Sequence, residues 1–589
     1  MNSPAQSASV FGNDNIVVQA SGSGVNVAIG PQPYLRLTQY ERRTKLAARD
    51  NSEAALLSAY RADVVPLIGR EVAMADLRTW LTGEAPVSVR VLVGAGGRGK
   101  TRLALELARE IVKEGWLAGF ATADELDRFR EQHGVEQWRW DKPVLVILDY
   151  AASRAEQLRA WIRELVDASL EERPKLRLLL LERQANRGIG WLATIFGQGD
   201  NDDSRAAIAL LDPKEPVELP ALDDLEFRRQ VFGALLKRAN ATLQAPPIGA
   251  DPEFDRLLAD RKWAGDPLYL MMAGLAAGNK GVSGALELSR ANLALSVARN
   301  ELERIGRIGA SRGIDEQHTF PGAFVRHMSV IVTLAQGLTR EEARGLASDE
   351  LKAMNSSAPL DGIIEALCDA LPPQDISDGI APILPDIVGE AAILVWFGDE
   401  GAIRQAGLAP EERIHAAAQL RLSKVSETLV RAVQDFAPSG LRDGIVWIES
   451  LAKRRDDDLT SIIQIAVTLR SDLVELQSLS DHLYSKIAIE LPGSVPIETS
   501  LGRRTRQFAL NVLSEIIHGT SLDSEHIVDF AEYIRKPEAK FLFQREGASF
   551  DLNSIPLRIL ADELGRIVIS VDELSPNSAT RTHEYELPD

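Results

Sequence analysis

Cysteine and histidine are scarce in this sequence. Its 589 residues include one cysteine, Cys368, and eight histidines. A single cysteine cannot form a disulfide within the chain or a cysteine-based zinc site. The residues around it, 363–371, have helical apolar spacing, which favours a buried thiol over a nucleophile. The histidines are scattered without an HExxH pair, so the sequence gives no support to metal-dependent hydrolysis of that type.

Long apolar runs are also missing. No stretch of about 18 apolar residues occurs, so we expect no membrane-spanning helix and no membrane partner. The first residues lack the basic region and apolar core of a secretion signal. These two absences and the cysteine count predict a cytoplasmic protein.

Positive charge is outweighed by negative charge. The chain has 66 Lys and Arg against 85 Asp and Glu, a net charge of -19. Binding to a phosphate backbone requires a positive surface, so this balance argues against nucleic acid as a general partner. The basic cluster at residues 503–506 is interpreted as the solvated start of a helix.

The length predicts several domains, because one hydrophobic core does not extend over 589 residues. Residues 1–32 contain two alternating segments joined by a Ser/Gly turn, which predicts a β-hairpin. A lone hairpin is marginally stable in water, so this one must pair with something else. Residues 33–62 read as a helical linker.

Alternating strands and helices are the pattern of the next segment, residues 63–222. Buried strands are predicted at 87–93, 116–121, 144–149 and 176–181, with helices at 101–113 and 154–168 between them. This alternation predicts a mostly parallel α/β sheet.

Strand signals fade after residue 222. Residues 223–315 are predicted to be helical, and 316–400 to hold three helices followed by a turn-rich piece at 376–385. Amphipathic helices resembling repeats are predicted in 401–574, with short strands near its end. The polar tail, 575–589, is predicted to be disordered.

The most informative segment is the loop at residues 94–101 (GAGGRGKT), which satisfies the pattern GxxxxGK followed by Ser or Thr. Glycines are required because main-chain N–H groups must wrap a polyphosphate closely. Lys100 is expected to reach the β- and γ-phosphates, and the Thr101 hydroxyl to bind Mg²⁺. The residues predicted to contact ATP or ADP here are Gly94, Ala95, Gly96, Gly97, Arg98, Gly99, Lys100, Thr101 and Arg102.

Two further chemical groups follow buried strands. Asp149 ends the strand at 144–149 and is expected to hold Mg²⁺ together with Thr101. Arg183 follows the strand at 176–181, where it faces the crevice in which α/β sheets bind ligands, and is a candidate sensor of the γ-phosphate. Lys100, Asp149 and Arg183 are the predicted catalytic residues. Tyr150 and Ala151 follow Asp149, so no second carboxylate stands beside it, and slow turnover is expected.

In this order and spacing, the motifs resemble the STAND class of signal-transducing P-loop ATPases, which includes NB-ARC and NACHT proteins, and especially its bacterial members. The resemblance extends from Val65 to about Glu390. Besides the loop, it rests on residues 66–71 (PLIGRE), 145–151 (LVILDYA), 178–183 (LLLLER), 219–222 (LPAL), 265–267 (GDP) and 384–390 (LPDIVGE). It implies that Gly69, Arg70 and Pro267 lie against the nucleotide.

The resemblance also implies an architecture and a switch. Residues 63–222 are expected to be the nucleotide-binding domain, 223–315 a helical lid, 316–400 a winged-helix-like domain and 401–574 a sensor. ADP would hold a closed monomer, and a protein trigger would permit exchange for ATP and homo-oligomerisation. The histidine that contacts the β-phosphate in some members has no counterpart here, since His327 and His415 lie on apolar-spaced helices and are interpreted as packed.

The sequence says less about how such a switch would pass on its signal. Residues 1–62 contain neither His nor Cys, so no Ser-His-Asp or Cys-His arrangement can form there, and the hairpin is expected to recruit a separate effector or to mediate self-assembly. The resemblance alone suggests a role in bacterial antiphage defence. Two alternatives stay open: a DNA-binding transcriptional regulator of the same ATPase class, and a non-switching remodeller of the AAA+ type.

Overall fold

The computed structural model describes most of residues 52–454, two short strands near the C-terminus, residues 35–39 and three single positions. The gaps within 52–454 are 61–64, 133–137, 139, 168–172, 188–189, 198–201, 261–264, 313, 315–323, 355–356, 373–378 and 400. The predicted hairpin at 1–32 and the predicted disordered tail at 575–589 lie outside the described residues.

A five-stranded parallel sheet forms the core of the α/β half, in the order β2-β3-β4-β1-β5. The strands are β1 (Val87–Val93), β2 (Leu117–Phe120), β3 (Val144–Asp149), β4 (Leu176–Glu182) and β5 (Val217–Glu218). The continuous apolar runs of β3 and β4 are buried on both faces, as central parallel strands require. The four strands predicted from sequence are therefore confirmed.

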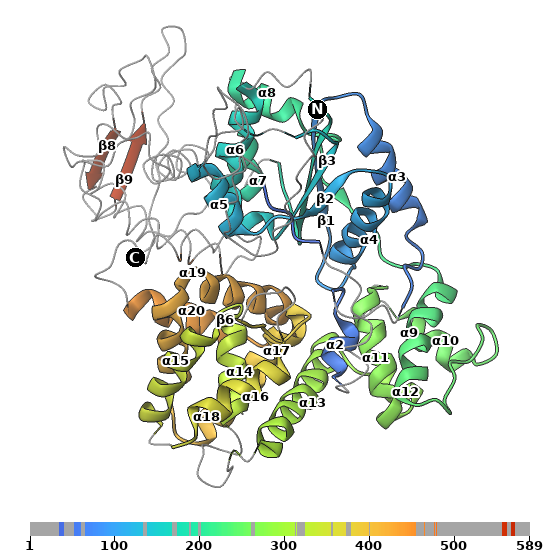
Figure 1. The fold of residues 1–589 in the computed structure, drawn as a ribbon, viewed down its shortest axis with the longest axis vertical. Helices are drawn as coiled ribbons and strands as arrows, with labels where there is room; N and C mark the ends of the chain where they lie inside the picture. The colour runs from blue at the N-terminus through green and yellow to red at the C-terminus, as the bar shows by residue number, and fades with distance from the viewer. Residues whose placement is uncertain are drawn as a thin grey trace, which may run out of the picture.

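Helices cover both faces of this sheet (Figure 1). One face packs against α3 (Glu71–Thr82) and α4 (Lys100–Lys113). The other packs against helices that follow β2, β3 and β4. These are α5 (Ala123–Gln132), α6 (Ala155–Asp167), α7 (Gly190–Phe196) and α8 (Asp202–Ala209), with a 3-10 turn, η1 (Ala151–Arg154), before α6. The result is a three-layer arrangement whose strands end together at one edge.

The outer edge of β2 is covered by an extended segment from the N-terminal region. Thr38 and Phe120 exchange main-chain hydrogen bonds of 2.8 and 3.0 Å. Gly119 permits this approach, since a Cβ there would lie 2.7 Å from the carbonyl oxygen of Thr38. Residues 35–39 of the predicted helical linker are thus extended, and its described helix is the short α2 (Glu53–Leu57). A sheet edge that would otherwise be open is closed by the chain itself.

Residues after β5 are helical, as predicted. The segment contains α9 (Leu225–Ala239), α10 (Pro252–Ala259), α11 (Pro267–Lys280), α12 (Val282–Leu286) and α13 (Arg290–Ser311). Side chains of Asp224, Asp251 and Ser289 accept N–H bonds at the starts of α9, α10 and α13. α2 packs here too, because the Ser52 hydroxyl donates to the buried carboxylate of Glu301 at about 3.0 Å.

The remaining helical half runs to residue 454. It comprises α14 (Phe324–Leu334), β6 (Leu338–Thr339), α15 (Arg340–Ala353), α16 (Leu360–Ala370), β7 (Gly379–Ile380), α17 (Asp386–Phe397), α18 (Ala402–Gln405), α19 (Pro410–Phe436), the 3-10 turn η4 (Ala437–Ser439) and α20 (Asp443–Arg454). β7 falls in the turn-rich piece predicted at 376–385 and pairs antiparallel with β6. The assignment of 316–400 as a winged-helix domain stays a prediction.

The sequence-based boundary at residue 400 is not a boundary in the packing. One hydrophobic cluster runs without interruption from α9–α13 through α14 and α17 to α19 and α20. α19 returns over α14 and α17, so that it lies beside the α/β half in Figure 1. The described helices between 402 and 454 therefore belong to the same packed body as those of 324–397.

His327 is fully buried in this body. Its Nε2 lies 2.9 Å from Glu350, and its Nδ1 accepts a bond of 3.1 Å from the indole N–H of Trp396. The interpretation of His327 as a packed histidine is confirmed, while His415 is half-buried on α19.

Near the C-terminus, β8 (Leu557–Ala561) and β9 (Ile567–Val571) pair antiparallel, which confirms the short strands predicted there. Within the part of the chain that the structure describes, no helix combines the length and the apolar character needed to cross a bilayer.

Candidate nucleotide-binding site

The glycine-rich loop joins β1 to α4 at the carboxyl edge of the sheet. Gly97 and Gly99 have φ values of +85° and +95°, a region that side chains with a Cβ rarely adopt. Gly99 immediately precedes Lys100, the first residue of α4. The loop therefore leads directly into the positive N-terminal end of α4, a position at which anions are commonly bound.

Lys100 folds back over this loop. Its Nζ donates to the carbonyl oxygens of Gly94 at 2.5 Å and of Ala95 at 3.3 Å. Burial lowers the pKa of Lys100 to about 8, and the nearby carboxylate of Asp149 partly opposes that shift. A phosphate oxygen would offer this buried ammonium a charged acceptor in place of neutral carbonyls.

Thr101 and Asp149 meet across the sheet edge. The Thr101 hydroxyl donates to a carboxylate oxygen of Asp149 at 2.8 Å. Burial raises the pKa of Asp149, and the bond from Thr101 opposes the rise. A hydroxyl and a carboxylate are oxygen ligands of the kind Mg²⁺ prefers, so these two residues fit the predicted metal site.

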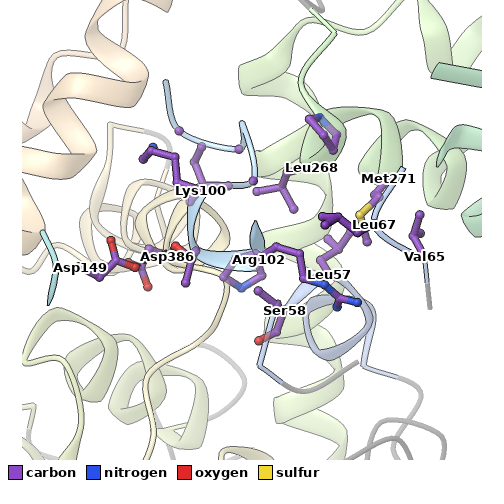
Figure 2. Close-up of a pocket in the computed structure, with 18 of the residues that line it drawn as sticks. Leu57, Ser58, Val65, Leu67, Lys100, Arg102, Asp149, Leu268, Met271 and Asp386 are labelled. Carbon is purple, nitrogen blue, oxygen red and sulfur yellow. Dashed lines mark hydrogen bonds between the residues drawn. The ribbon is translucent and has the colours of Figure 1, made fainter. Parts of the chain in front are cut away.

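A cavity of about 200 Å³ opens beside the loop. It is polar near Lys100 and Asp149 and apolar near Leu57, Leu67 and Met271 (Figure 2). A nucleoside triphosphate needs this combination, with charged groups around its phosphates and an apolar wall against its base. The wall formed by the end of α2 was not predicted from the sequence.

Residues of the segment 66–71 (PLIGRE) form part of the wall of the cavity. Arg70 lines it, but its guanidinium donates to the carbonyl oxygens of Pro220 at 2.7 Å and Arg98 at 3.0 Å. Burial and the neighbouring Arg98 lower the pKa of Arg70 to about 10. Gly69 has φ +64°, and a Cβ there would lie 2.6 Å from the Phe227 ring. Arg70 is thus bonded to the loop at Arg98, and Gly69 packs against α9 at Phe227. Contact of either residue with nucleotide stays a prediction.

The glycine-rich loop is tied to the starts of α11 and α13 through a buried acid. Asp266, which is fully buried, accepts from Nε of Arg98 at 2.5 Å and also pairs with Arg290. The N–H of Leu268 donates to the carbonyl oxygen of Gly97 at 3.2 Å. Of the other predicted contacts, Pro267 lines the cavity, as does Arg102, whose guanidinium pairs with Glu106 at 3.0 Å.

Arg183 connects the sheet edge to the helical half. Its guanidinium lies 2.9 Å from Asp435 of α19 and 3.2 Å from Glu390 of α17. Burial lowers the pKa of Arg183, but the carboxylates of Asp435 and Glu390 outweigh burial, so its pKa lies above the ordinary value. Arg183 lines the cavity and is held there by two acids from a different part of the chain, while its role as a sensor of the γ-phosphate stays a prediction.

Asp435 also stands directly on the phosphate loop. A Cβ on Gly96 would lie 3.0 and 3.2 Å from the two carboxylate oxygens of Asp435, and 3.2 Å from Ile387 of α17. Ile387 of α17 and Asp435 of α19 thus both lie against the loop at Gly96, and Asp435 brings a carboxylate there.

Tyr150 makes a second contact between the sheet edge and the helical half. Its hydroxyl donates to the carboxylate of Asp386, the first residue of α17. The guanidinium of Arg431 lies 4.6 Å from the centre of the Tyr150 ring and 3.4 Å from Glu390. The residue after Asp149 therefore binds the helical half.

The sequence analysis did not single out the acids that surround the site. They are Glu182, Asp386, Glu390 and Asp435. Asp386 and Glu390 lie in the 384–390 segment that was noted for its resemblance but given no role, and Asp435 lies on an amphipathic helix far along the chain. Glu182 was visible as the residue before Arg183 and was not interpreted.

The strand, glycine-rich loop, helix and facing carboxylate have the architecture of a P-loop NTPase. No protein-family model matches the sequence, and neither does any curated protein. Among solved structures, the chain is similar to the Orc1 protein of Aeropyrum pernix in complex with DNA, with 15% identity and a TM-score of 0.25, over 52% of this chain and 85% of that one. A DNA replication initiation factor gives 16% identity and a TM-score of 0.25, over 61% of this chain and 94% of that one. Likenesses at this TM-score support no inference, and the P-loop assignment rests on the strand order and the contacts above.

Proposed function

We propose that this chain is an ATP/ADP-controlled switch of the STAND type, in which the terminal phosphate decides whether α17 and α19 stay closed over the nucleotide. Lys100 and the loop N–H groups would bind the phosphates. Thr101 and Asp149 would hold Mg²⁺, which supplies charge neutralisation on the phosphate oxygens. The cavity wall at Leu57 and Met271 would take the base.

The position of Asp435 carries this proposal. Its carboxylate is paired with Arg183 and lies against Gly96, in the cradle that a polyphosphate would enter. Two anions cannot share this space without repulsion, which is strong where water is excluded. A third phosphate would therefore compete with Asp435 for Arg183, whereas a diphosphate, being shorter, could leave that ion pair in place.

The energy required is within reach of a few such contacts. Shifting a two-state population from 1:99 to 99:1 takes roughly 5.5 kcal/mol of differential binding. Hydrogen bonds to charged groups contribute about 1.5–3 kcal/mol each. Contacts from the third phosphate to Arg183 in the open state, together with repulsion between that phosphate and Asp435 in the closed state, would contribute to that difference.

Release of α17 and α19 would expose surfaces now packed on the loop, and we propose that these mediate homo-oligomerisation. The protein trigger would act on the helices beyond residue 400, and a separate effector would receive the signal through the N-terminal region. A role in antiphage defence is part of the same proposal and rests on the resemblance to the STAND class.

Nucleotide retained by the purified protein tests the proposal. We expect the wild type to retain adenine nucleotide and Lys100→Ala to retain none while keeping its circular dichroism spectrum. Lys113→Ala is the matched control, because Lys113 is exposed at the other end of α4. A wild type without affinity for any nucleoside triphosphate, or normal retention by Lys100→Ala, would overturn it.

A further inference from the structure

Hydrolysis of ATP needs a group that orients the attacking water, and β3 does not supply one beside its metal-binding acid. Asp149 is committed to Thr101, as its bond of 2.8 Å shows. The next residue, Tyr150, binds Asp386 through its hydroxyl, and Ala151 has no polar side chain. The other described acids that line the cavity are Glu182 of β4, Asp386, which binds Tyr150, and Asp435, which pairs with Arg183.

β4 is the strand in position to provide such a group. It lies between β1, which leads into the phosphate loop, and β3, which ends in Asp149. In register, Glu182 is paired with Val93, the last residue before the loop, and Leu181 is paired with Asp149. Since neighbouring strands are about 4.8 Å apart, Glu182 emerges at the sheet edge one strand away from each.

Glu182 faces the same side of the sheet as the helices that follow β3. Side chains alternate along a strand, so Leu148 of β3 and Leu180 of β4 face one side of the sheet, while Asp149 and Leu181 face the other. Leu148 and Leu180 both belong to the core on the α6 side of the sheet, so Glu182, two residues after Leu180, shares that side. Glu182 therefore stands on the α6 side of the sheet edge, at the start of η1 where it accepts from Ala152, and one strand away from Asp149.

Main-chain donors hold this carboxylate in one orientation. Its Oε1 accepts from the N–H of Arg183 at 2.7 Å, and its Oε2 accepts from the N–H of Ala152 at 2.9 Å. Each oxygen keeps a second lone pair, so the group can still accept a proton from water. Glu182 is 8% exposed and lines the cavity with Lys100.

The burial of Glu182 also favours a role as proton acceptor. It raises the pKa of Glu182, while the bonds from Arg183 and Ala152 oppose the rise. A carboxylate with a raised pKa is a better proton acceptor at neutral pH than an exposed one.

We propose that Glu182 replaces the missing acid after Asp149 and is the proton acceptor in hydrolysis of the nucleoside triphosphate. In this step the water oxygen forms a bond to the γ-phosphorus as one of its protons passes to Glu182. The bond from that phosphorus to the bridging oxygen breaks, and its electron pair stays on the diphosphate. The inference rests on the proposed function, since it requires a nucleotide in the cavity.

The test uses the full chain with Glu182→Gln, which keeps the size of the side chain and removes its basicity. Binding is measured with a fluorescent ATP analogue and Mg²⁺, and hydrolysis in single turnover. Both are repeated in an Asp435→Asn background, so that closure by α19 does not limit the rate. Glu215→Gln, at an exposed acid before β5, is the matched control.

We expect Glu182→Gln to bind ATP with nearly wild-type affinity and to hydrolyse it more slowly by a factor on the order of 10² or greater. Glu182→Asp, which keeps a carboxylate, should recover part of kcat without a change in KM. Hydrolysis by Glu182→Gln at the wild-type rate would overturn the inference. Loss of binding together with activity would also overturn it, because the residue would then only brace Ala152 and Arg183.

Failure of the proposed function gives a different pattern. A wild type that binds no nucleotide would contradict the switch itself, whatever Glu182 does. A wild type and Asp435→Asn variant that both bind ATP and never hydrolyse it would contradict only the role of Glu182.

Discussion

Arg183, directly after β4, and Asp435, in the last turn of α19, form an ion pair of 2.9 Å, and both residues line the cavity beside the glycine-rich loop. One partner belongs to the sheet and the other to the helical half. The same carboxylate presses on the phosphate loop at Gly96. The contact that closes the two halves is thus also the contact that a terminal phosphate would displace.

Removal of the charge on Asp435 should favour ATP. Asp435→Asn keeps the shape of the side chain and removes the anion from the cradle, and charges a few ångströms apart at a protein surface interact by a few kcal/mol. We expect ATP affinity to rise on the order of tenfold or more, with a much smaller change for ADP, as measured by titration calorimetry. Glu449→Gln, at an exposed acid on α20, is the control. Equal gains for ADP and ATP would argue against discrimination at the third phosphate.

ATP affinity should fall as the pH rises through 8. The pKa of Lys100 is lowered to about 8, so above that pH the folded, nucleotide-free protein loses the charge that attracts phosphate. Affinity should decline toward a tenfold loss per pH unit, and binding near pH 9 should take up a proton. Calorimetry in buffers of different ionisation enthalpy measures that proton. A pH-independent affinity between 7 and 9.5 would show that Lys100 does not meet the phosphates.

The buried acid between loop and lid should be costly to remove. Asp266→Ala leaves Arg98 and Arg290 without their shared partner, and breaking a buried pair from one side typically costs about 3–5 kcal/mol. Denaturant unfolding should show a loss of this order and a lower Tm. Glu253→Ala removes a fully exposed ion pair on α10 and should leave the unfolding midpoint nearly unchanged. Equal effects of the two variants would contradict the placement of Asp266.

Two glycines on helices should respond oppositely to alanine. A Cβ on Gly389 of α17 would lie 2.6 Å from the carbonyl oxygen of Ile383 and 2.8 Å from Thr333, so Gly389→Ala should cost about 1–3 kcal/mol. Gly345 on α15 has nothing within 4 Å of that position, so Gly345→Ala should stabilise by about 0.5–1 kcal/mol. Thermal unfolding of both variants checks the sign. A stabilising Gly389→Ala would show that α17 is not packed against α14 as described.

The α/β half was predictable because the sequence patterns of its strands and of its glycine-rich loop are local. The buried runs of β3 and β4, the glycine loop and Asp149 lie in continuous stretches whose spacing follows from strand and helix geometry. The pairing of Thr101 with Asp149 also followed, since parallel strands present their carboxyl ends at one edge.

The contacts that close the site were not predictable in the same way. Asp435 looks like any acid on an amphipathic helix, and nothing near it in sequence indicates that α19 folds back to Gly96. Such pairings depend on how the lid and α14–α17 stack, which is decided by the long-range packing of one large hydrophobic cluster. The extended contact of Thr38 with β2 was missed for the same reason.

The distance between the two halves tests the central claim most directly. Spin labels at K113C on α4 and E449C on α20, in a Cys368→Ser and Glu182→Gln background, report that distance by double electron–electron resonance. With ADP and Mg²⁺ we expect one narrow distribution that fits the closed arrangement, and with ATP and Mg²⁺ a longer, distinct one. The same distribution in both nucleotides, with binding of both established, would show that the terminal phosphate does not control α19.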